Sequence, residues 1–500
     1  MLTEHRQRLL QFQTELNLAE YLYASGQPAR QDVFSVWAEH SDLFTPARIA
    51  ELKKLREETS ESRETDRAAL TRLIAMAIDS NVFLCMRELS REIRQREDQP
   101  GITHGTQTLT LSQARFALTR EPNPQARQEI HARMRESLRR LHDLREEWIE
   151  KLSEAARAHD HPHYLSLCSL THEQPYEALA TQAASLLNAT ESVFVTTMSD
   201  AMPRELGQPL SLTSMADLPY LRRQAALDRY FPGWQFREIY EEIFRGLGLR
   251  VWQRTNVTLE SCAQPRRAAA AFCAPVEIPT DIRVVRRPLD GVAAWRASLH
   301  ATGQAQHLAW TSEHLAVEFR LGVDTSVNES WGMLFAGLLH EPRWLSGTMR
   351  FYESRAPRQT QGLLNLLAAR TDAATHVYET ELQGGKLSGA APARYAELLS
   401  DAIRMTVDPA GYLYALRHPF AAAARLRARA FESQLREHMK TKYGHSWWLA
   451  PRAGDMLADL WNLGFRHSPE QLSRMIGLGE LSFDYLATEL LADCGSRVMD

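Results

Sequence analysis

Apolar residues recur at helical spacing along most of the chain. Near the amino terminus, Leu9, Phe12 and Leu16 lie three to four residues apart, which places them on one face of a helix. The charged residues between the apolar positions are typical of solvated helix faces. The longer stretches with this pattern are residues 63–96, 125–158, 293–310 and 327–340. The pattern therefore predicts a mainly α-helical protein.

The pattern changes between residues 250 and 290. Three short runs there are rich in β-branched and aromatic residues: 251–257, 271–276 and 282–287. Such runs predict strands, so we expect one small β-sheet within the helical body.

The composition shifts once toward Pro, Ser and Gly, at residues 200–219. We place a soft boundary there, between an amino-terminal helical part (1–200) and a second part (201–500). A chain of 500 residues is long enough to bury a large core. We expect both parts to form one structural unit.

Charge, apolar runs and cysteine content indicate which partners and which cellular location to expect. The formal net charge is −4 and the isoelectric point is about 6.5, so charge gives no argument for nucleic acid or an anionic membrane. We find neither a signal-peptide core at the amino terminus nor a run of about 18 apolar residues. The five cysteines are scattered, which indicates reduced thiols. We expect a cytoplasmic protein, and the high Arg and Ala content suggests a bacterial source.

The segment from His300 to Gln304 contains the candidate chemistry. It reads His-Ala-Thr-Gly-Gln, and Glu329 follows 29 residues after His300. Zinc peptidases with the H-E-x-x-H motif place two histidines one helical turn apart, with a glutamate that activates the zinc-bound water. A third ligand, often a glutamate, comes from a later helix. In this chain the first histidine and a candidate third ligand are present.

The flanking residues strengthen this comparison. His300, Gly303 and His307 keep the register of H-E-x-G-H-x-x-H, and S-V-N-E-S follows at 326–330. With A-F-C-A-P-V at 271–276 and I-R-V-V-R-R-P at 282–288, the chain resembles the zinc peptidases (gluzincins) of the oligoendopeptidase F, thimet oligopeptidase and angiotensin-converting enzyme group over about residues 200–490. The resemblance implies a large two-lobed helical body. It also implies a small sheet beside a deep central cleft, whose edge strand pairs with an extended peptide.

The departures from this family fall on the catalytic positions. Ala301 stands where the general base is expected, and general-base catalysis contributes about 10²- to 10⁴-fold. Gln304 replaces the second histidine with a neutral amide, which is a poor zinc ligand. His307 does not substitute, because seven helical residues rise about 10.5 Å. We therefore expect no bound metal, and either a bound water in the vacated space or hydrogen bonding among His300, Gln304 and Glu329.

Other candidate residues carry weaker signals. Gly303, His307 and His418 are possible cleft residues. The resemblance places His418 where the family has an oxyanion-stabilising histidine, whereas its position at a helix start is typical of a surface histidine. The aligned tyrosine positions fall on Arg425 and Ala428.

Three further signals favour structural roles. The histidines at 159, 161 and 163 indicate an exposed loop, the segment 340–344 a helix end, and Cys273 a packing position.

Two functions from different classes follow. The first is a catalytically degenerate metallopeptidase-like protein that binds peptides or a protein partner in the ancestral cleft. The alternative is an active zinc metallopeptidase that cleaves short peptides with non-standard ligands. A scaffold whose groove has closed is a third possibility.

Overall fold

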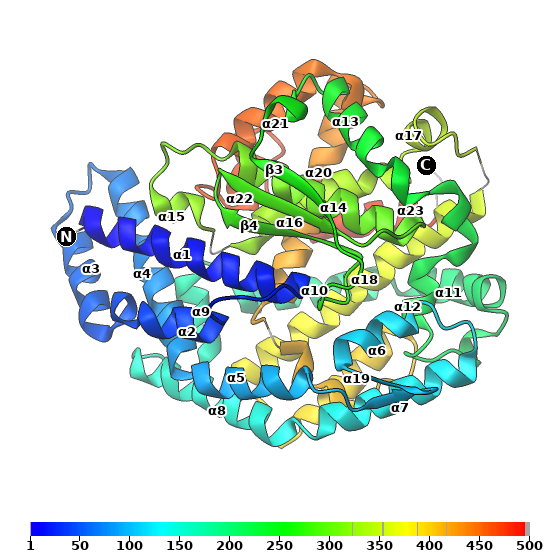
Figure 1. Cartoon of the computed structure of the whole chain (residues 1–500), viewed down its shortest axis with the longest axis horizontal. Coiled ribbons are helices and arrows are strands. Elements are labelled where there is room, and N and C mark those ends of the chain that lie inside the picture. Colours follow the sequence, from blue (N-terminus) through cyan, green and yellow to red (C-terminus); the bar gives the residue numbers. More distant parts are fainter. Residues whose placement is uncertain (1, 323, 353–354, 388, 417, 496–500) are drawn as a thin grey trace.

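The structure is a computed structural model that describes residues 2–322, 324–352, 355–387, 389–416 and 418–495. Helices dominate the described residues, and two small sheets complete the fold (Figure 1). The expected mainly α-helical architecture is confirmed.

The first amino-terminal helices lie on the left and along the lower side of the molecule in Figure 1, and the last of the group lies on the right. They are α1 (Leu2–Ser25), α2 (Val33–Glu39), α3 (Pro46–Glu58), α4 (Glu64–Cys85), α5 (Arg87–Glu97), α6 (Leu111–Leu118), α7 (Pro124–Arg139), α8 (His142–Ala158), α9 (Tyr164–Thr171), α10 (Tyr176–Ala189) and α11 (Glu191–Leu206). Local chemistry sets several of their starts. The Asn123 side chain, for example, accepts hydrogen bonds from the first turn of α7, where Pro124 is pre-organised.

The prediction of one continuous helix is wrong for two of the long stretches, because each forms two helices. The stretch 63–96 breaks at Met86, between α4 and α5, and the stretch 125–158 breaks at Leu141, between α7 and α8. Met86 and Leu141 are both buried, with φ near −105°. Because the residue at each break is itself apolar and buried, the hydrophobic pattern continues where the backbone turns.

Strands make up two sheets. A hairpin of β1 (Ile102–His104) and β2 (Gln107–Leu109) turns at Gly105, whose φ is +57°. The second sheet has the order β3-β5-β4, with β3 (Val257–Ser261) parallel to β5 (Asp281–Arg286), and β4 (Ala271–Glu277) antiparallel to it.

The prediction of a strand at 251–257 is wrong for most of these residues. Val251–Gln253 form a 3₁₀ turn, and β3 begins only at Val257. Leu249 and Val251 are buried in the core just after helix α13 (Phe236–Gly246). Their burial, rather than strand pairing, explains the local composition.

The second half of the chain supplies the helices around the candidate site. They are α12 (Leu218–Arg223), α13 (Phe236–Gly246), α14 (Val292–Trp310), α15 (Val317–Arg320), α16 (Thr325–Ala336), α17 (Pro342–Gly347), α18 (Arg355–Gln383), α19 (Ala391–Ile403), α20 (Ala421–Tyr443), α21 (Pro451–Asn462), α22 (Pro469–Met475) and α23 (Phe483–Asp493). The expected helix at 293–310 is present as α14. The expected helix at 327–340 is present as α16 and a following 3₁₀ turn, Gly337–His340.

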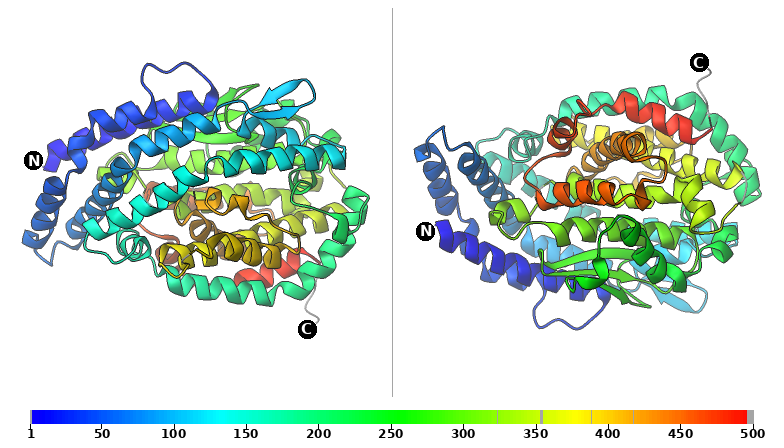
Figure 2. Two further views of the ribbon diagram at one scale, coloured as in Figure 1. Left: turned by 90° about the horizontal axis from the view of Figure 1, so that it is seen from below. Right: turned by 90° about the horizontal axis from the view of Figure 1, so that it is seen from above.

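These elements stack in the order sheet, α14, α16, α20 and α23 (Figure 2). Helix α14 is buried on almost all sides, between β4 and β5 on one side and α16 on the other. One cluster of buried apolar residues extends from Leu9 to Cys494. Residues from both predicted parts of the chain therefore share a core.

Helix α4 is long and apolar enough to span a membrane by length and composition. A core helix passes the same test, and Leu70, Leu73, Ile78 and Val82 of α4 are buried in the core. This one helix is weak evidence for a membrane span.

Two glycines allow α14 and α16 to cross closely. A Cβ atom on Gly303 would lie 2.2 Å from the carbonyl oxygen of Trp331, and one on Gly332 would lie 2.7 Å from the His300 ring. Both distances are far shorter than van der Waals contact. The His300 ring therefore rests directly on the backbone of α16.

We predict that Gly303→Ala destabilises the protein by about 1–3 kcal/mol, although alanine is the better helix former. The new methyl group meets backbone atoms of α16, which move only if the helices separate. The matched control is Gly347→Ala at the end of α17, where nothing lies within 4 Å of the added atom. Urea unfolding measures the stability of both variants. Equal unfolding midpoints for Gly303→Ala and Gly347→Ala would contradict the close crossing of the helices.

Candidate functional site

The helix crossing brings together the three residues at the expected zinc-ligand positions. Gln304 Nε2 donates to Glu329 Oε1 at 2.9 Å, and His300 Nε2 lies 3.2 Å from Glu329 Oε2. His300 and Gln304 are one turn apart on α14, and Glu329 faces them from α16. We call these three residues the triad.

The triad is accessible to solvent although it lies deep among the helices. The His300 and Glu329 side chains are each 27% exposed, and Gln304 is half-buried. Surrounding protein is nevertheless dense enough for burial to act on the ionisation of Glu329. We call this partly exposed position among the helices the recess.

The charge of Glu329 depends on its neighbours. Burial acts to raise the pKa of Glu329, but the charge of His300 and its hydrogen bond, followed by the charges of Arg425 and Arg429, outweigh burial. The pKa of this carboxyl is therefore below its ordinary value. Glu329 is ionised at neutral pH, with both of its oxygens engaged by the triad.

The residues present do not fit a zinc ion of the peptidase type. Both oxygens of Glu329 contact side chains of the triad, and Gln304 directs an N–H group, which is no metal ligand, toward the carboxylate. Ala301 is 1% exposed and packs in the core, so it supplies no general base. In the part of the chain that the structure describes, no group of three or more His, Cys, Asp and Glu side chains is arranged to hold a metal ion.

His307 does not line the recess, contrary to the expectation. Its side chain is fully buried, with Nε2 at 3.1 Å from the Gly464 carbonyl oxygen and Nδ1 at 3.0 Å from the Asn328 side-chain amide. Burial lowers the pKa of His307. A neutral imidazole that joins α14 to two neighbouring segments is a structural residue.

Gly303 and His418 also differ in their surroundings from the triad. Gly303 is buried at the helix crossing, where it sets the distance between the helices and presents no surface. His418 is exposed in the turn that precedes α20. Of the aligned tyrosine positions, Arg425 pairs with Asp372 at 2.6 Å, whereas Ala428 is completely buried.

The remaining histidine and cysteine signals have structural roles. His159 Nε2 contacts the Asn81 side chain at 3.0 Å, and His163 caps α9 by accepting from Ser166 N. Burial, together with nearby cationic side chains, lowers the pKa of His340 to about 3. Burial raises the pKa of the Cys273 thiol to about 12, which leaves it without nucleophilic character at neutral pH.

Sequence reasoning missed a group of arginines beside the triad: Arg222, Arg296, Arg425 and Arg429. We call this group the arginine cluster. Arg296 is one turn before His300 on α14, and Arg425 and Arg429 are one turn apart on α20. The spacing of four was available in the sequence, but only the helix packing shows that these faces meet.

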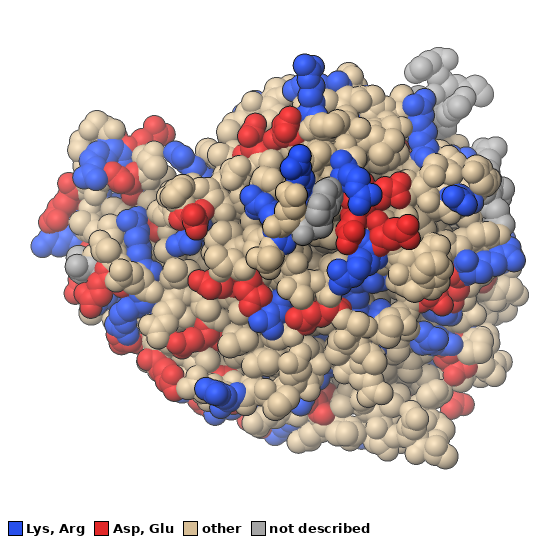
Figure 3. Space-filling view, turned by 45° about the horizontal axis from the view of Figure 1, so that its top comes forward, with Lys and Arg blue, Asp and Glu red and all other residues tan. Residues whose placement is uncertain are grey.

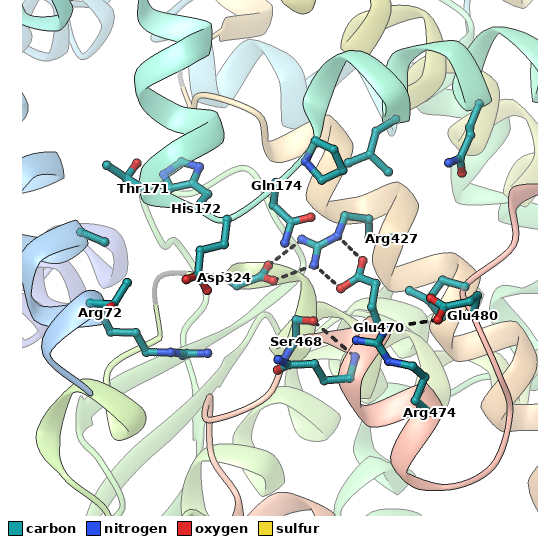
Figure 4. Close-up of a pocket in the computed structure, with 18 of the residues that line it drawn as sticks. Arg72, Thr171, His172, Gln174, Asp324, Arg427, Ser468, Glu470, Arg474 and Glu480 are labelled. Atoms are coloured by element: carbon teal, nitrogen blue, oxygen red, sulfur yellow. Dashed lines mark hydrogen bonds and ion pairs between the residues drawn. The ribbon is translucent and has the colours of Figure 1, made fainter. Parts of the chain in front are cut away.

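A separate cavity of about 490 Å³ lies away from the triad (Figure 4). In its wall Arg427 pairs with Asp324 at 2.9 Å and with Glu470 at 2.6 Å. Arg425 and Arg427 are two residues apart on α20 and so point to opposite faces of the helix. Because none of the triad residues lines this cavity, we place the candidate site at the triad.

Another hollow, of about 400 Å³, borders the edge strand β3. Its lining includes Trp234, Leu259 and Arg286, and Trp234 is 75% exposed. Acidic and basic side chains are interspersed over the face in Figure 3, without an extended area of one charge.

The fold is mainly helical, with α14 and α16 crossing at the triad. Among solved structures, the chain is similar to one described as "BsuCP Crystal Structure", with a TM-score of 0.63, 12% sequence identity and coverage of 98% of each chain. No family model and no curated protein matches the sequence. At this identity the similarity shows a shared fold, and the particular peptidase group that the sequence resembles stays a prediction.

We predict that the triad makes stability depend on acid pH. A carboxyl whose pKa is lowered on folding adds stability above its ordinary pKa of 4.5. That stability is lost as the pH falls through the lower folded pKa. The difference in unfolding free energy between wild type and Glu329→Gln should therefore be largest above the ordinary pKa of 4.5 and shrink as the pH falls below it.

In a His300→Asn background, the same difference should be smaller at neutral pH and change less with pH, because the charge and the hydrogen bond of His300, which lower the pKa of Glu329, are then absent. Urea unfolding at a series of pH values measures all four proteins. A difference that does not change with pH would show that the ion pair does not form in solution.

Proposed function

We propose that this protein is a catalytically degenerate metallopeptidase-like protein that binds a peptide or a protein partner. The observation that carries the proposal is the Gln304–Glu329 hydrogen bond of 2.9 Å. In this bond the Gln304 amide donates to the Glu329 carboxylate, which in a zinc peptidase would bind the metal ion. The buried Ala301 supports the same conclusion, because no carboxylate stands at the position of the base.

Peptide binding is supported by the free edge of the sheet. Among the described residues, strand β3 pairs only with β5, so its outer edge can pair with an extended chain through backbone groups. The Leu259 carbonyl on this strand accepts from the Arg237 side chain at 3.4 Å, which a bound chain would displace. The hollow beside it offers the exposed Trp234 ring as an apolar contact. Neither feature needs the lost catalytic residues. We propose that such binding takes place in the cytoplasm.

The alternative function is an active zinc metallopeptidase with non-standard ligands. It would need Glu329 to exchange both of its side-chain contacts for a metal ion, and it would need a base from outside the motif. The zinc experiment below separates the two functions, and the peptide experiment after it tests the β3 edge as the binding site.

We predict that the wild-type protein, purified without an affinity tag, loaded with zinc and desalted, retains no zinc and does not hydrolyse short peptides. Gln304→His, in contrast, should retain zinc near one equivalent, because it restores two histidines one turn apart opposite Glu329. Gln304→Asn is the matched control and should retain none. Elemental analysis gives the stoichiometry. Zinc held by the wild type and lost in His300→Ala would overturn the proposal.

We predict that peptides selected by the wild type from a display library require the β3 edge. Trp234→Ala should weaken their binding about tenfold or more, since an exposed aromatic anchor contributes strongly to recognition. Gln304→Ala, in the triad, should bind them equally well. Fluorescence anisotropy with the selected peptides measures both variants. Equal affinity for wild type and Trp234→Ala would remove the β3 edge as the binding site.

A further inference from the structure

The arginine cluster has more positive charge than its surroundings balance. Asp372, on α18, accepts hydrogen bonds from Arg425 at 2.6 and 2.9 Å, and it lies 3.7 Å from Arg429. One carboxylate therefore serves two guanidinium groups. The charge of Arg222 also acts on Asp372.

Arg296 has no carboxylate of its own among the described residues. Its Nε and Nη2 atoms are sheltered from solvent and have no hydrogen-bond partner there. Burial, followed by the positive charges of Arg222 and Arg429, lowers the pKa of Arg296 to about 10. A sheltered guanidinium without an acceptor is costly, unless something else supplies the acceptor.

The nearby acidic groups do not restore the balance. Glu329 is engaged by His300 and Gln304. Burial raises the pKa of Glu379, which lies near Arg425, to about 8, so this carboxyl is mostly protonated at neutral pH. Four guanidinium groups thus share two carboxylates, Asp372 and Glu329, and the second of these is already engaged by the triad.

The cluster is also reachable from solvent. Arg222 is exposed, and the side chains of Arg425 and Arg429 are 39% and 18% exposed. Four guanidinium groups from α12, α14 and α20 converge beside the triad. Guanidinium forks match the geometry of phosphate oxygens, and their attraction strengthens where water is partly excluded.

We propose that the arginine cluster binds a doubly charged oxyanion, either inorganic phosphate or the phosphate group of a monoester. Four guanidinium groups and two carboxylates leave an excess of two positive charges, which a dianion balances while it supplies acceptors to Arg296. A ligand with a single carboxylate would balance only one of the two charges. The proposal goes beyond the proposed function, because it concerns the recess and not the β3 edge. It also stands or falls independently of zinc retention and peptide binding.

The test is calorimetric titration of the full chain with inorganic phosphate at constant ionic strength in sodium chloride. The wild type should bind phosphate saturably, and Arg296→Met and Arg429→Gln should each weaken binding at least tenfold. Arg452→Gln, an exposed arginine on α21, is the matched control and should bind as the wild type does. If Arg296→Met does not fold, the exposed Arg222→Gln gives the same measurement.

Thermal unfolding separates specific binding from salt effects. Phosphate stabilises proteins in general by exclusion from their surface, but that effect does not saturate and is equal in all variants. The wild type should show an additional, saturable increase in Tm that Arg296→Met lacks.

Two further probes define the anion. Phosphoserine that binds at least tenfold more tightly than inorganic phosphate would assign the site to a phosphate monoester, and equal affinities would assign it to free phosphate. Acetate that binds as tightly as phosphate, phosphate binding that does not saturate, or affinity that is unchanged in both arginine variants would each overturn the proposal.

Discussion

The close crossing of α14 and α16 is the constraint on which the candidate site depends. Gly303 lies against the backbone of Trp331, and Gly332 lies under the His300 ring. Only at this separation can His300 and Gln304 both reach the carboxylate of Glu329. The crossing itself is buried between the sheet and α20, so the core fixes the geometry of the triad.

Much of the fold and the position of the triad could be predicted from the sequence, because both leave periodic or spaced signals. The helix at α14 and the meeting of His300, Gln304 and Glu329 are examples. The breaks at Met86 and Leu141 could not be predicted, since a buried apolar residue at a turn preserves the helical period. The arginine cluster was also beyond sequence reasoning, because its members come from α12, α14 and α20, and only tertiary packing brings them together.

The site shows how a change of ligand type changes the charge that a recess accommodates. A zinc site gathers neutral imidazoles and carboxylates around a cation. In this chain an amide occupies one ligand position, and guanidinium groups surround the remaining carboxylate. The charges of His300, Arg425 and Arg429 therefore favour the ionised form of Glu329, and any excess of charge in the recess is positive.

Gly303 has a consequence for how such a protein changes over evolutionary time. Its lack of a side chain is needed for two helices to pack, so selection for folding alone is enough to keep it. A catalytic base at position 301 would face no such requirement, because alanine packs there without loss. In a lineage that abandons hydrolysis, the framework of a motif should therefore outlast its reactive residues. The residues of the motif that remain are then those that the packing of the helices requires, and not those that the reaction required.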